Sequence, residues 1–356
     1  MGNRGEDGLL RVAVIGGGIA GLTCARLLAA RGCAVRVLDK GRRPGGRVST
    51  RRTDGHAYDH GAQYFTARDA RFRGLVKMLR REGAVANWRG RFVNIVNGDL
   101  RQAPVDDNER FVGVPGMSTL AAWLATDVPV MTGVQVARIE HDRNRWTVIA
   151  ADGVRCDNFD VVIVAVPAPQ AEPLIKTAPA LADAAAAVRI ESCWTAMIAL
   201  ERPMPVGFDA AMVTGGALSW IARDGAKPGR TGAETWVLHA SDQWSRAHLD
   251  DNHASVAEAL LVAFAEATNV ILTGVEELQA HRWRYARVVK AVGQPCLFDE
   301  ERRIGACGDW CLGARIEAAF LSGTAMAEQV LASLLPVCRS GAAVSTALSP
   351  SGRHPT

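Results

Sequence analysis

A glycine-rich segment near the start of the chain has the spacing of a phosphate-binding turn. Residues 16–21, GGGIAG, satisfy the pattern G-x-G-x-x-G, directly after an apolar run at 10–15 and at the start of a helical pattern over 19–31. In such a turn the glycines permit a tight bend, close approach of the backbone to a diphosphate, and close packing of helix on strand. The helix start then directs N–H groups and a positive dipole end at the phosphates. The residues expected at the dinucleotide are Gly16, Gly18, Ile19, Ala20 and Gly21.

An acidic residue follows at the position where a ribose-binding group is expected. Residues 34–38 predict a second strand, and Asp39 ends it, about 20 residues after the glycine turn. A carboxylate there can bridge the ribose hydroxyls, with Lys40 beside it. These features predict a βαβ unit that binds a dinucleotide, but they do not distinguish NAD from FAD.

A second glycine-rich loop decides between the two dinucleotides. Residues 41–47, GRRPGGR, follow Asp39 immediately, within a basic stretch that continues to Arg52. Here the sequence resembles the flavin-containing amine oxidase superfamily, whose members share a G-G-R loop after the second strand. The resemblance implies that Gly45, Gly46 and Arg47 lie along the diphosphate and ribityl chain of FAD.

A third motif lies near the C-terminus. Gly308-Asp309 follows a predicted strand at 304–307 and precedes a predicted helix at 318–335. The resemblance implies that Asp309 binds the ribityl chain and that the helix start points at the flavin pyrimidine, where its dipole would stabilise negative charge on the reduced ring. The further residues that the resemblance places at FAD are Gln63, Tyr64, Val136, Gly308, Arg315, Ile316 and Ala319.

Four internal stretches resemble the bacterial renalase-like branch of this superfamily more closely than the amine oxidases proper. They are YDHGAQYFTAR at 58–68, WIARDGAKPGR at 220–230, WVLHAS at 236–241 and HRWRYA at 281–286. The resemblance spans about residues 10–335. It implies an enzyme that oxidises isomers of dihydro-NAD(P) reduced at the wrong ring carbon. Hydride would pass to the flavin, dioxygen would reoxidise it to give hydrogen peroxide, and NAD(P)+ would leave.

This chemistry asks little of the side chains. A dihydropyridine becomes aromatic when it loses hydride, so the protein has only to place the ring against the flavin. Aromatic faces and a few hydrogen-bond donors would suffice. The candidates are Trp283, His239, Trp220, Trp194 and Gln63. Core packing explains each tryptophan equally well, and a structural hydrogen bond within a strand explains His239 slightly better.

Two other functions stay open at this point. An amine oxidase would need an aromatic cage, and the three tyrosines Tyr58, Tyr64 and Tyr285 permit a two-tyrosine cage without indicating one. A non-catalytic binding protein of the same fold is the second alternative, and the three intact flavin motifs argue against it. Cys307 lies in the predicted strand rather than in a loop, so we predict noncovalent FAD.

Composition excludes several other classes of protein. The net charge of +4 over 356 residues predicts neither nucleic acid nor an anionic membrane as a partner. The sequence contains no uncharged apolar run of about 18 residues, so it predicts no membrane span. The eight cysteines show neither CxxC spacing nor ligand-spaced histidines, which predicts reduced thiols in a cytoplasmic protein without a disulfide framework or a metal site. The sequence does not indicate an oligomeric state.

The order of the predicted elements indicates an α/β protein. Strands and helices alternate at both ends of the chain, and the middle is richer in strands. We therefore expect a Rossmann-like FAD-binding domain built from separated segments, with an inserted α+β substrate domain. The expected divisions are 1–73, 100–168 and 288–336 for the FAD-binding domain, 74–99 and 169–287 for the substrate domain, and 337–356 for a flexible tail. Other expected elements are helices at 71–82, 118–125, 170–190 and 255–268, a hairpin at 88–100 turning at Asn97-Gly98, and strands at 134–139, 145–150, 159–166, 194–200, 218–222 and 235–240.

Overall fold

The computed structural model describes residues 9–53, 55–103, 108–230 and 234–334. The expected flexible tail at 337–356 lies outside these residues. Within them, no helix has both the length and the apolar character needed to cross a membrane.

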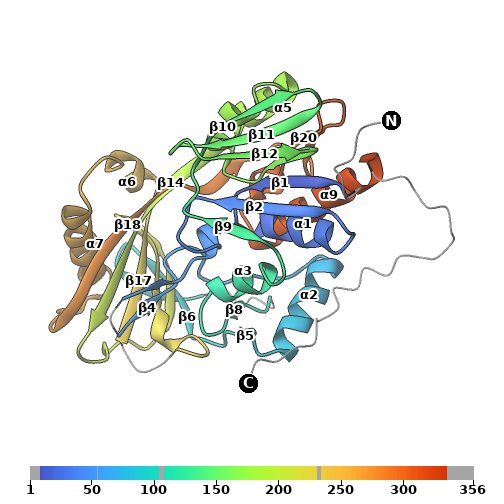
Figure 1. Ribbon diagram of the computed structural model, residues 1–356. Coiled ribbons are helices and arrows are strands. Elements are labelled where there is room, and N and C mark those ends of the chain that lie inside the picture. The colour runs from blue at the N-terminus through green and yellow to red at the C-terminus, as the bar shows by residue number, and fades with distance from the viewer. Residues whose placement is uncertain (1–8, 54, 104–107, 231–233, 335–356) are drawn as a thin grey trace.

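A six-stranded sheet forms the centre of the first domain (Figure 1). Its strand order is β19-β20-β13-β1-β2-β9, and every neighbouring pair is parallel except the β19–β20 pair. The apolar runs of its central strands are buried on both faces, as a parallel sheet requires. The strands are β1 (Arg11–Ile15), β2 (Ala34–Asp39), β9 (Val130–Thr132), β13 (Val161–Val164), β19 (Leu297–Asp299) and β20 (Ile304–Ala306).

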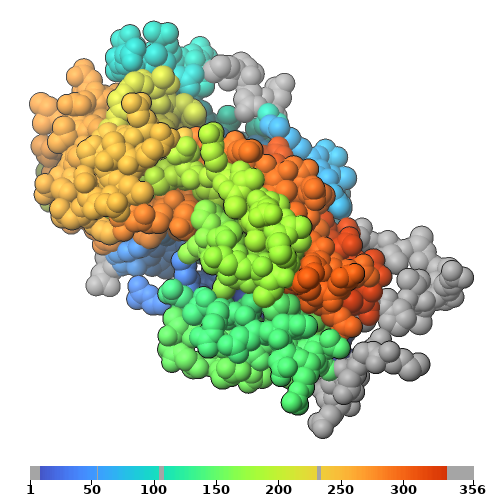
Figure 2. All heavy atoms as spheres, turned by 90° about the horizontal axis from the view of Figure 1, so that it is seen from above, coloured from blue at the N-terminus to red at the C-terminus, as the bar shows by residue number. Residues whose placement is uncertain are grey.

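Each face of this sheet has its own cover. Helices α1 (Ile19–Ala29) and α9 (Ile316–Leu334) pack on the face that carries Val12 and Val14. The opposite face carries Ala13 and packs against a three-stranded sheet and the segment 168–188. That small sheet consists of β10 (Val136–Asp142), β11 (Arg145–Ala150) and β12 (Arg155–Phe159). Figure 2 shows it from above, in green, as a projection separate from the yellow and orange α6–α7 region, with blue N-terminal residues visible between them.

A seven-stranded sheet forms the second domain, in the order β18-β14-β17-β16-β15-β6-β7. Because successive strand residues point to opposite faces, Trp194, Trp236 and Leu238 pack beneath α7, while His239 and Trp220 face the N-terminal segment 58–65. The strands are β6 (Phe92–Val96), β7 (Asp99–Gln102), β14 (Arg189–Leu200), β15 (Ala210–Thr214), β16 (Leu218–Arg223), β17 (Glu234–Ala240) and β18 (Val275–Lys290), and the covering helices are α6 (Asp242–Ala247) and α7 (His253–Thr268).

The remaining elements connect the two sheets. They are the two-stranded pairs β3 (Arg51–Arg52) with β4 (Ala57–Tyr58) and β5 (Val85–Asn87) with β8 (Phe111–Gly113), the helices α2 (Ala70–Arg81), α3 (Ser118–Leu124), α4 (Ala168–Ala171), α5 (Pro179–Ala186) and α8 (Asp309–Leu312), and 3-10 turns at Gly46–Val48, Glu172–Leu174 and Asp224–Ala226.

Most local predictions are confirmed, and the differences have physical causes. The hairpin turns at Asn97-Gly98, where both residues have positive φ. The helix expected at 118–125 begins at Ser118, as predicted, with Met117 as its N-cap. The expected helix over 170–190 divides into α4, a 3-10 turn and α5, because Pro173 and Pro179 each start a new turn.

Several strands lie outside the predicted ones, and the longest of these is β18. The long strand β18 carries the sequence VEELQAHRWRYARVVK and is half-exposed along most of its length, so its charged residues hide the alternation of a strand. The short strand β12 also lies outside the predicted strands, except for Phe159, where the next strand was expected to begin. The expected division into domains remains a prediction. The strand β7, at Asp99–Gln102, belongs to the seven-stranded sheet.

Candidate active site

The three glycine-containing motifs meet at one end of the six-stranded sheet. The N–H of Gly45 donates to the carbonyl of Gly17 at 2.8 Å, which seats the G-G-R loop on the glycine turn. The Arg47 guanidinium makes a two-point ion pair with Asp309, at 2.7 and 2.9 Å, across 262 residues of sequence. The fold therefore brings together all three segments that the sequence assigned to FAD.

The three glycines of the first motif do different things. Gly16 has φ +112°, and a Cβ there would lie 2.8 Å from the Ala165 carbonyl oxygen. A Cβ on Gly21 would collide with the Gly16 carbonyl. Gly18, in contrast, has φ −82°, a value open to any residue, and a Cβ on it would meet nothing within 4 Å. Gly16 and Gly21 are therefore required by packing, whereas Gly18 faces open space.

The start of α1 is suited to a diphosphate. Its N-cap is Gly18, which offers no side-chain acceptor to the first-turn N–H groups of Ile19 and Ala20. Gly46 of the G-G-R loop lies alongside, because its Cβ position would be 3.8 Å from the Gly18 Cα. An uncapped helix start beside open space and the G-G-R loop fits the diphosphate of FAD.

Asp39 is held at the edge of this cradle. Its two carboxylate oxygens accept from the Gly17 N–H at 2.5 Å and the Gly41 N–H at 2.7 Å, and each oxygen keeps a lone pair for a ribose hydroxyl. The Asp39 carbonyl accepts from Val134 N–H, so the strand that begins at Val136 lies beside the same turn. Lys40 is exposed next to it.

The start of α9 holds a residue that the sequence reasoning missed. Glu317 is buried, and its carboxylate accepts from the N–H groups of Arg68 and Asp69 at 2.6 and 2.7 Å. It ties the loop after Tyr64 to the helix start that carries Ile316 and Ala319, while the Arg315 side chain is exposed. An acid directly before a predicted helix was the available signal. Gly308 is fixed separately, by its N–H donating to Ser322 Oγ.

The loop that carries Gln63 lies directly on the G-G-R loop. Ala62 N–H donates to the Arg47 carbonyl at 2.9 Å, and a Cβ on Gly61 would collide with that same carbonyl. Any group presented by residues 59–63 is therefore close to the expected flavin segment.

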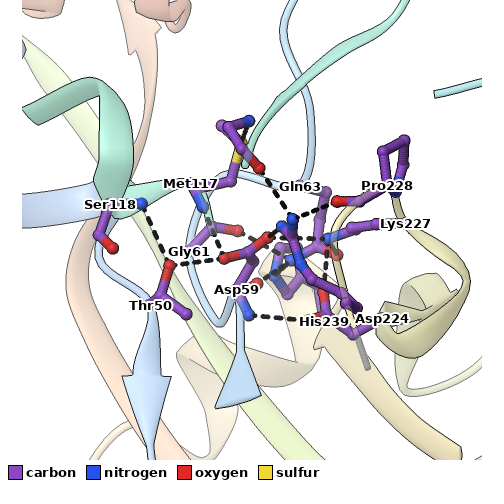
Figure 3. Close-up of polar contacts among 12 residues, drawn as sticks. Thr50, Asp59, Gly61, Gln63, Met117, Ser118, Asp224, Lys227, Pro228 and His239 are labelled. Carbon is purple, nitrogen blue, oxygen red and sulfur yellow. Dashed lines mark hydrogen bonds and ion pairs between the residues drawn. The ribbon is translucent and has the colours of Figure 1, made fainter. Parts of the chain in front are cut away.

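Four buried charges lie beneath this loop (Figure 3). Lys227 Nζ lies 2.6 Å from Asp224 and 3.6 Å from Asp59, and Arg230 pairs with Asp59. Asp59 also accepts from Thr50 Oγ1 at 2.7 Å and from the Met117 N–H at 2.9 Å. We call Asp59, Asp224, Lys227 and Arg230 the buried charge cluster.

The two acids of the buried charge cluster have opposite pKa shifts. Burial alone would raise the pKa of Asp59, but the charges of Lys227 and Arg230 hold it below its usual range. Burial raises the pKa of Asp224 even with Lys227 beside it. Asp59 is therefore the firmly ionised member, and all four charged groups are engaged with one another.

Gln63 uses both of its amide donors within the protein, and its Oε1 keeps one lone pair. Its Oε1 accepts from Lys227 at 3.2 Å, and its Nε2 donates to the carbonyls of Asp59 and Gly61 and lies 3.4 Å from His239 Nε2. Sequence reasoning offered Gln63 as a contact for both flavin and substrate. The structure shows it positioning the loop above the buried charge cluster.

Three histidines around the loop are neutral at physiological pH. Burial lowers the pKa of His239 to about 4, with Lys227 adding to the effect. Burial likewise lowers the pKa of His60 to about 3, and that of His281 to about 4 with help from Arg51. Arg51 Nη2 lies 3.3 Å from His281 Nδ1, which identifies this nitrogen as the acceptor.

Trp283 packs against two of these histidines, whose rings also contact each other. Its indole N–H donates to the His60 carbonyl at 2.9 Å, and its ring centroid lies 4.9 Å from that of His60 and 4.4 Å from that of His281. Its edge would be 3.4 Å from a Cβ on Gly61. Trp283 therefore supports the loop on the G-G-R segment.

The other two candidate tryptophans lie on opposite faces of the sheet. Trp220 packs 5.7 Å from Tyr64, in an aromatic group with Trp88 and Phe92. Trp194 is fully buried on the helix-covered face and donates its indole N–H to the His248 carbonyl. The structure brings Trp220 to the candidate site and excludes Trp194 from it.

The comparisons with known proteins agree with this geometry. Residues 14–79 match the model of the NAD(P)-binding Rossmann-like domain, and residues 93–331 match that of the flavin containing amine oxidoreductases. The second match covers most of the chain, so this protein belongs to the flavin containing amine oxidoreductase family. It is accordingly an FAD-binding oxidoreductase, with the expected α/β fold.

Individual relatives add less. The hydroxyneurosporene desaturase of Rubrivivax gelatinosus is 52% identical over 58 residues, 16% of this chain and 11% of that protein. The phytoene desaturase (neurosporene-forming) of Rhodobacter capsulatus is 40% identical over 67 residues, 19% and 13% of the two chains. The matched part of this chain thus spans a small fraction of either relative.

A solved structure shares the fold over nearly the whole length. A protein from Exiguobacterium sp. 255-15, described as a protoporphyrinogen oxidase, superposes with a TM-score of 0.74 over 92% of this chain and 99% of its own. At 13% sequence identity the likeness shows the fold alone. None of these comparisons distinguishes the renalase-like branch.

Replacement of Gly18 by valine should remove FAD and leave the polypeptide folded. The new side chain enters open space at the start of α1, where the diphosphate is expected, and its backbone angles suit any residue. We expect a colourless protein whose thermal unfolding matches that of the wild-type apoprotein. Gly21→Ala is the matched control and should unfold at a lower temperature, because its Cβ meets the Gly16 carbonyl. Stoichiometric flavin in Gly18→Val would show that this turn does not bind FAD.

Stability should fall as the pH falls from about 6.5 to about 4. Histidine in the unfolded chain takes up a proton near pH 6.5, whereas His60, His239 and His281 in the folded chain resist it until about pH 3 to 4. Between these values the unfolded state holds more protons, so acid favours unfolding. The midpoint temperature, followed by circular dichroism, should drop by several degrees over this range. His281→Gln should reduce the slope, and an equal slope in that variant would contradict the assignment.

Proposed function

We propose that this protein oxidises isomeric dihydronicotinamide dinucleotides, as the renalase-like resemblance implies, with dioxygen as the second substrate. FAD, when bound, supplies the acceptor for hydride and passes the electrons to dioxygen to give hydrogen peroxide. The four stretches that carry the resemblance supply the residues beside the G-G-R loop: Asp59 to Gln63, Lys227, His239 and Trp283.

The observation that carries this proposal is that the ionisable groups beside that loop are either paired or neutral. Lys227 bonds to both Asp224 and Gln63, and His60, His239 and His281 are held neutral by burial. None of these groups stands free as a strong base. Loss of hydride from a dihydropyridine needs no base, because the ring becomes an aromatic pyridinium directly, so a neutral, largely aromatic wall is what this reaction requires.

The tyrosines favour this reaction over amine oxidation. The Tyr58 side chain is fully buried and packs against Met197 and Val237. Its hydroxyl donates to Glu277 at 2.9 Å. Tyr58 therefore does not form a two-sided cage with Tyr64, which instead packs against Trp220.

The flavin is proposed to be noncovalently bound. Cys307 is fully buried, and burial raises the pKa of its thiol well above the usual value, so it is a poor nucleophile. Denaturation of the holoenzyme should therefore release all the flavin into solution.

Anaerobic stopped-flow at the flavin absorbance band tests the reaction. The holoenzyme would be mixed with an equilibrated NADH preparation that contains the minor isomers, with pure 1,4-NADH, and with a panel of amines. We expect fast bleaching by the first alone, with an amplitude limited by the isomer content, and hydrogen peroxide when air is readmitted. Bleaching by an amine alone would make the protein an amine oxidase, and bleaching by none would remove the proposed substrate.

Trp283 provides a second test of the same site. Trp283→Ala removes the ring that supports the loop at Gly61, so flavin reduction should slow about ten-fold or more while the affinity for FAD changes less than about three-fold. Trp283→Phe keeps a ring against His60 and His281 and should restore most of the rate. Flavin titration and stopped-flow measure the two quantities. Equal loss of rate and of FAD affinity in the alanine variant would indicate a purely structural role.

A further inference from the structure

A cleft of about 490 Å³ lies beside Thr66 and Ala67, which directly follow the segment that carries Gln63 and Tyr64. These two residues form one wall, and Phe111 of β8 contributes to another. The remaining wall is helix α2, which presents Arg73, Lys77 and Arg80. The family match and the site described above leave this cleft without a role.

The three cations share one face of α2. Their spacing of four and three residues places them in a row along the helix. All three are exposed, and among the residues that the structure describes none of them forms an ion pair. The basic residues of β18 differ, because Arg282 and Arg284 pair with Asp250, and Arg287 pairs with Asp242.

Helix electrostatics do not account for this row. Helix α2 has five basic residues and no acid in its twelve positions. Arg80 lies in the last turn, where a cation is favoured, but Arg73 lies in the first turn, where the dipole disfavours it. Among the residues that the structure describes, the one acid on the cleft wall is Glu109, which accepts from Asn87 Nδ2 at 2.6 Å. The cleft therefore has an unbalanced positive charge that suits an anion.

The cleft lies close to the expected flavin segment. Ala62 N–H donates to the Arg47 carbonyl, and Thr66 on the cleft wall is four residues further on, a distance of at most about 14 Å along extended chain. The far end of the same loop is fixed to the start of α9 by Glu317. A nicotinamide ring at the G-G-R loop would carry its diphosphate only a few bonds away, outward from the ring.

We propose that this cleft binds the diphosphate of the dinucleotide substrate, with Arg73, Lys77 and Arg80 pairing with the phosphate oxygens. The inference rests on the proposed function and adds to it the basis for choosing a dinucleotide over a simple dihydropyridine. Guanidinium and ammonium groups are the side chains that bind phosphate best. An adenosine 2′-phosphate would add charge at the same cleft.

Equilibrium binding of ADP to the holoenzyme tests the cleft without any need for turnover. The variant is R73Q/K77Q/R80Q, and the control is R138Q/R143Q/R155Q, which removes the same charge from the exposed three-stranded sheet, far from α2 (Figure 1). We expect the Kd for ADP to rise about ten-fold in the cleft variant and less than two-fold in the control. An unchanged Kd in the cleft variant overturns the proposal.

A second test measures the rate of flavin reduction in the same variants. With the isomeric dihydronicotinamide dinucleotide, the cleft variant should show a concentration for half-maximal rate raised about ten-fold and a limiting rate within about two-fold of wild type. With an N-alkyl dihydronicotinamide, which has no phosphate, wild type and variant should react alike. A fall in the limiting rate with both substrates would overturn the proposal. If no dihydronicotinamide bleaches the flavin but ADP binding still depends on the three cations, the cleft remains a diphosphate site and only the proposed oxidase reaction fails.

Discussion

The buried charge cluster constrains the site more than any other interaction. Asp59, Asp224, Lys227 and Arg230 come from two segments more than 160 residues apart and are nearly or completely withdrawn from water. Removal of one partner from such a cluster strands an uncompensated charge, which costs about 3–5 kcal/mol. The loop before Gln63 and the turn after β16 can therefore meet in one way only, with each acid against its cations.

A chain of contacts links the buried charge cluster to the G-G-R loop, where the flavin is expected. Lys227 donates a hydrogen bond to Gln63, and the neighbouring Ala62 N–H donates to the Arg47 carbonyl. The Arg47 side chain in turn forms an ion pair with Asp309. Glycines allow these layers to approach, since a Cβ on Gly61 would collide with the Arg47 carbonyl and one on Gly323 with the Ala20 carbonyl. The seven-stranded sheet, the G-G-R loop and α9 are thus held in place by short polar and backbone contacts as well as by a shared apolar core. A hydride-transfer enzyme needs such registration, because its rate depends on the distance between two rings.

The sequence could predict what depends on local spacing. The glycine turn, Asp39 and the Gly308-Asp309 pair are signals within a few residues of a strand end, and the structure brings all of them together. Gln63 and His239 could be named as candidates, but their roles could not, because Gln63 is engaged by Lys227, 164 positions away. The strand β18 was missed for a related reason. Its charged residues are tolerated because they have partners far away in the sequence. Arg282 and Arg287 pair with acids of the α6–α7 region, and Glu277 accepts from two hydroxyl groups of the segment 51–58. Burial of the charges and the identity of their partners are properties of the fold, not of the local pattern.

The alternation of side chains along a strand then shows which tryptophans lie at the site and which pack in the core. Once the register is known, Cys193 lies opposite Trp283 and Thr195 opposite both His239 and His281, so the side chains on that face converge on the N-terminal loop. Trp194, between them in sequence, must point the other way, into the core under α7. The same alternation places His239 where burial and Lys227 keep it neutral. The electrostatics of the candidate site are consequently set by the sheet register. A shift of one residue would turn His239 and His281 to the helix-covered face and would present core tryptophans to the flavin instead.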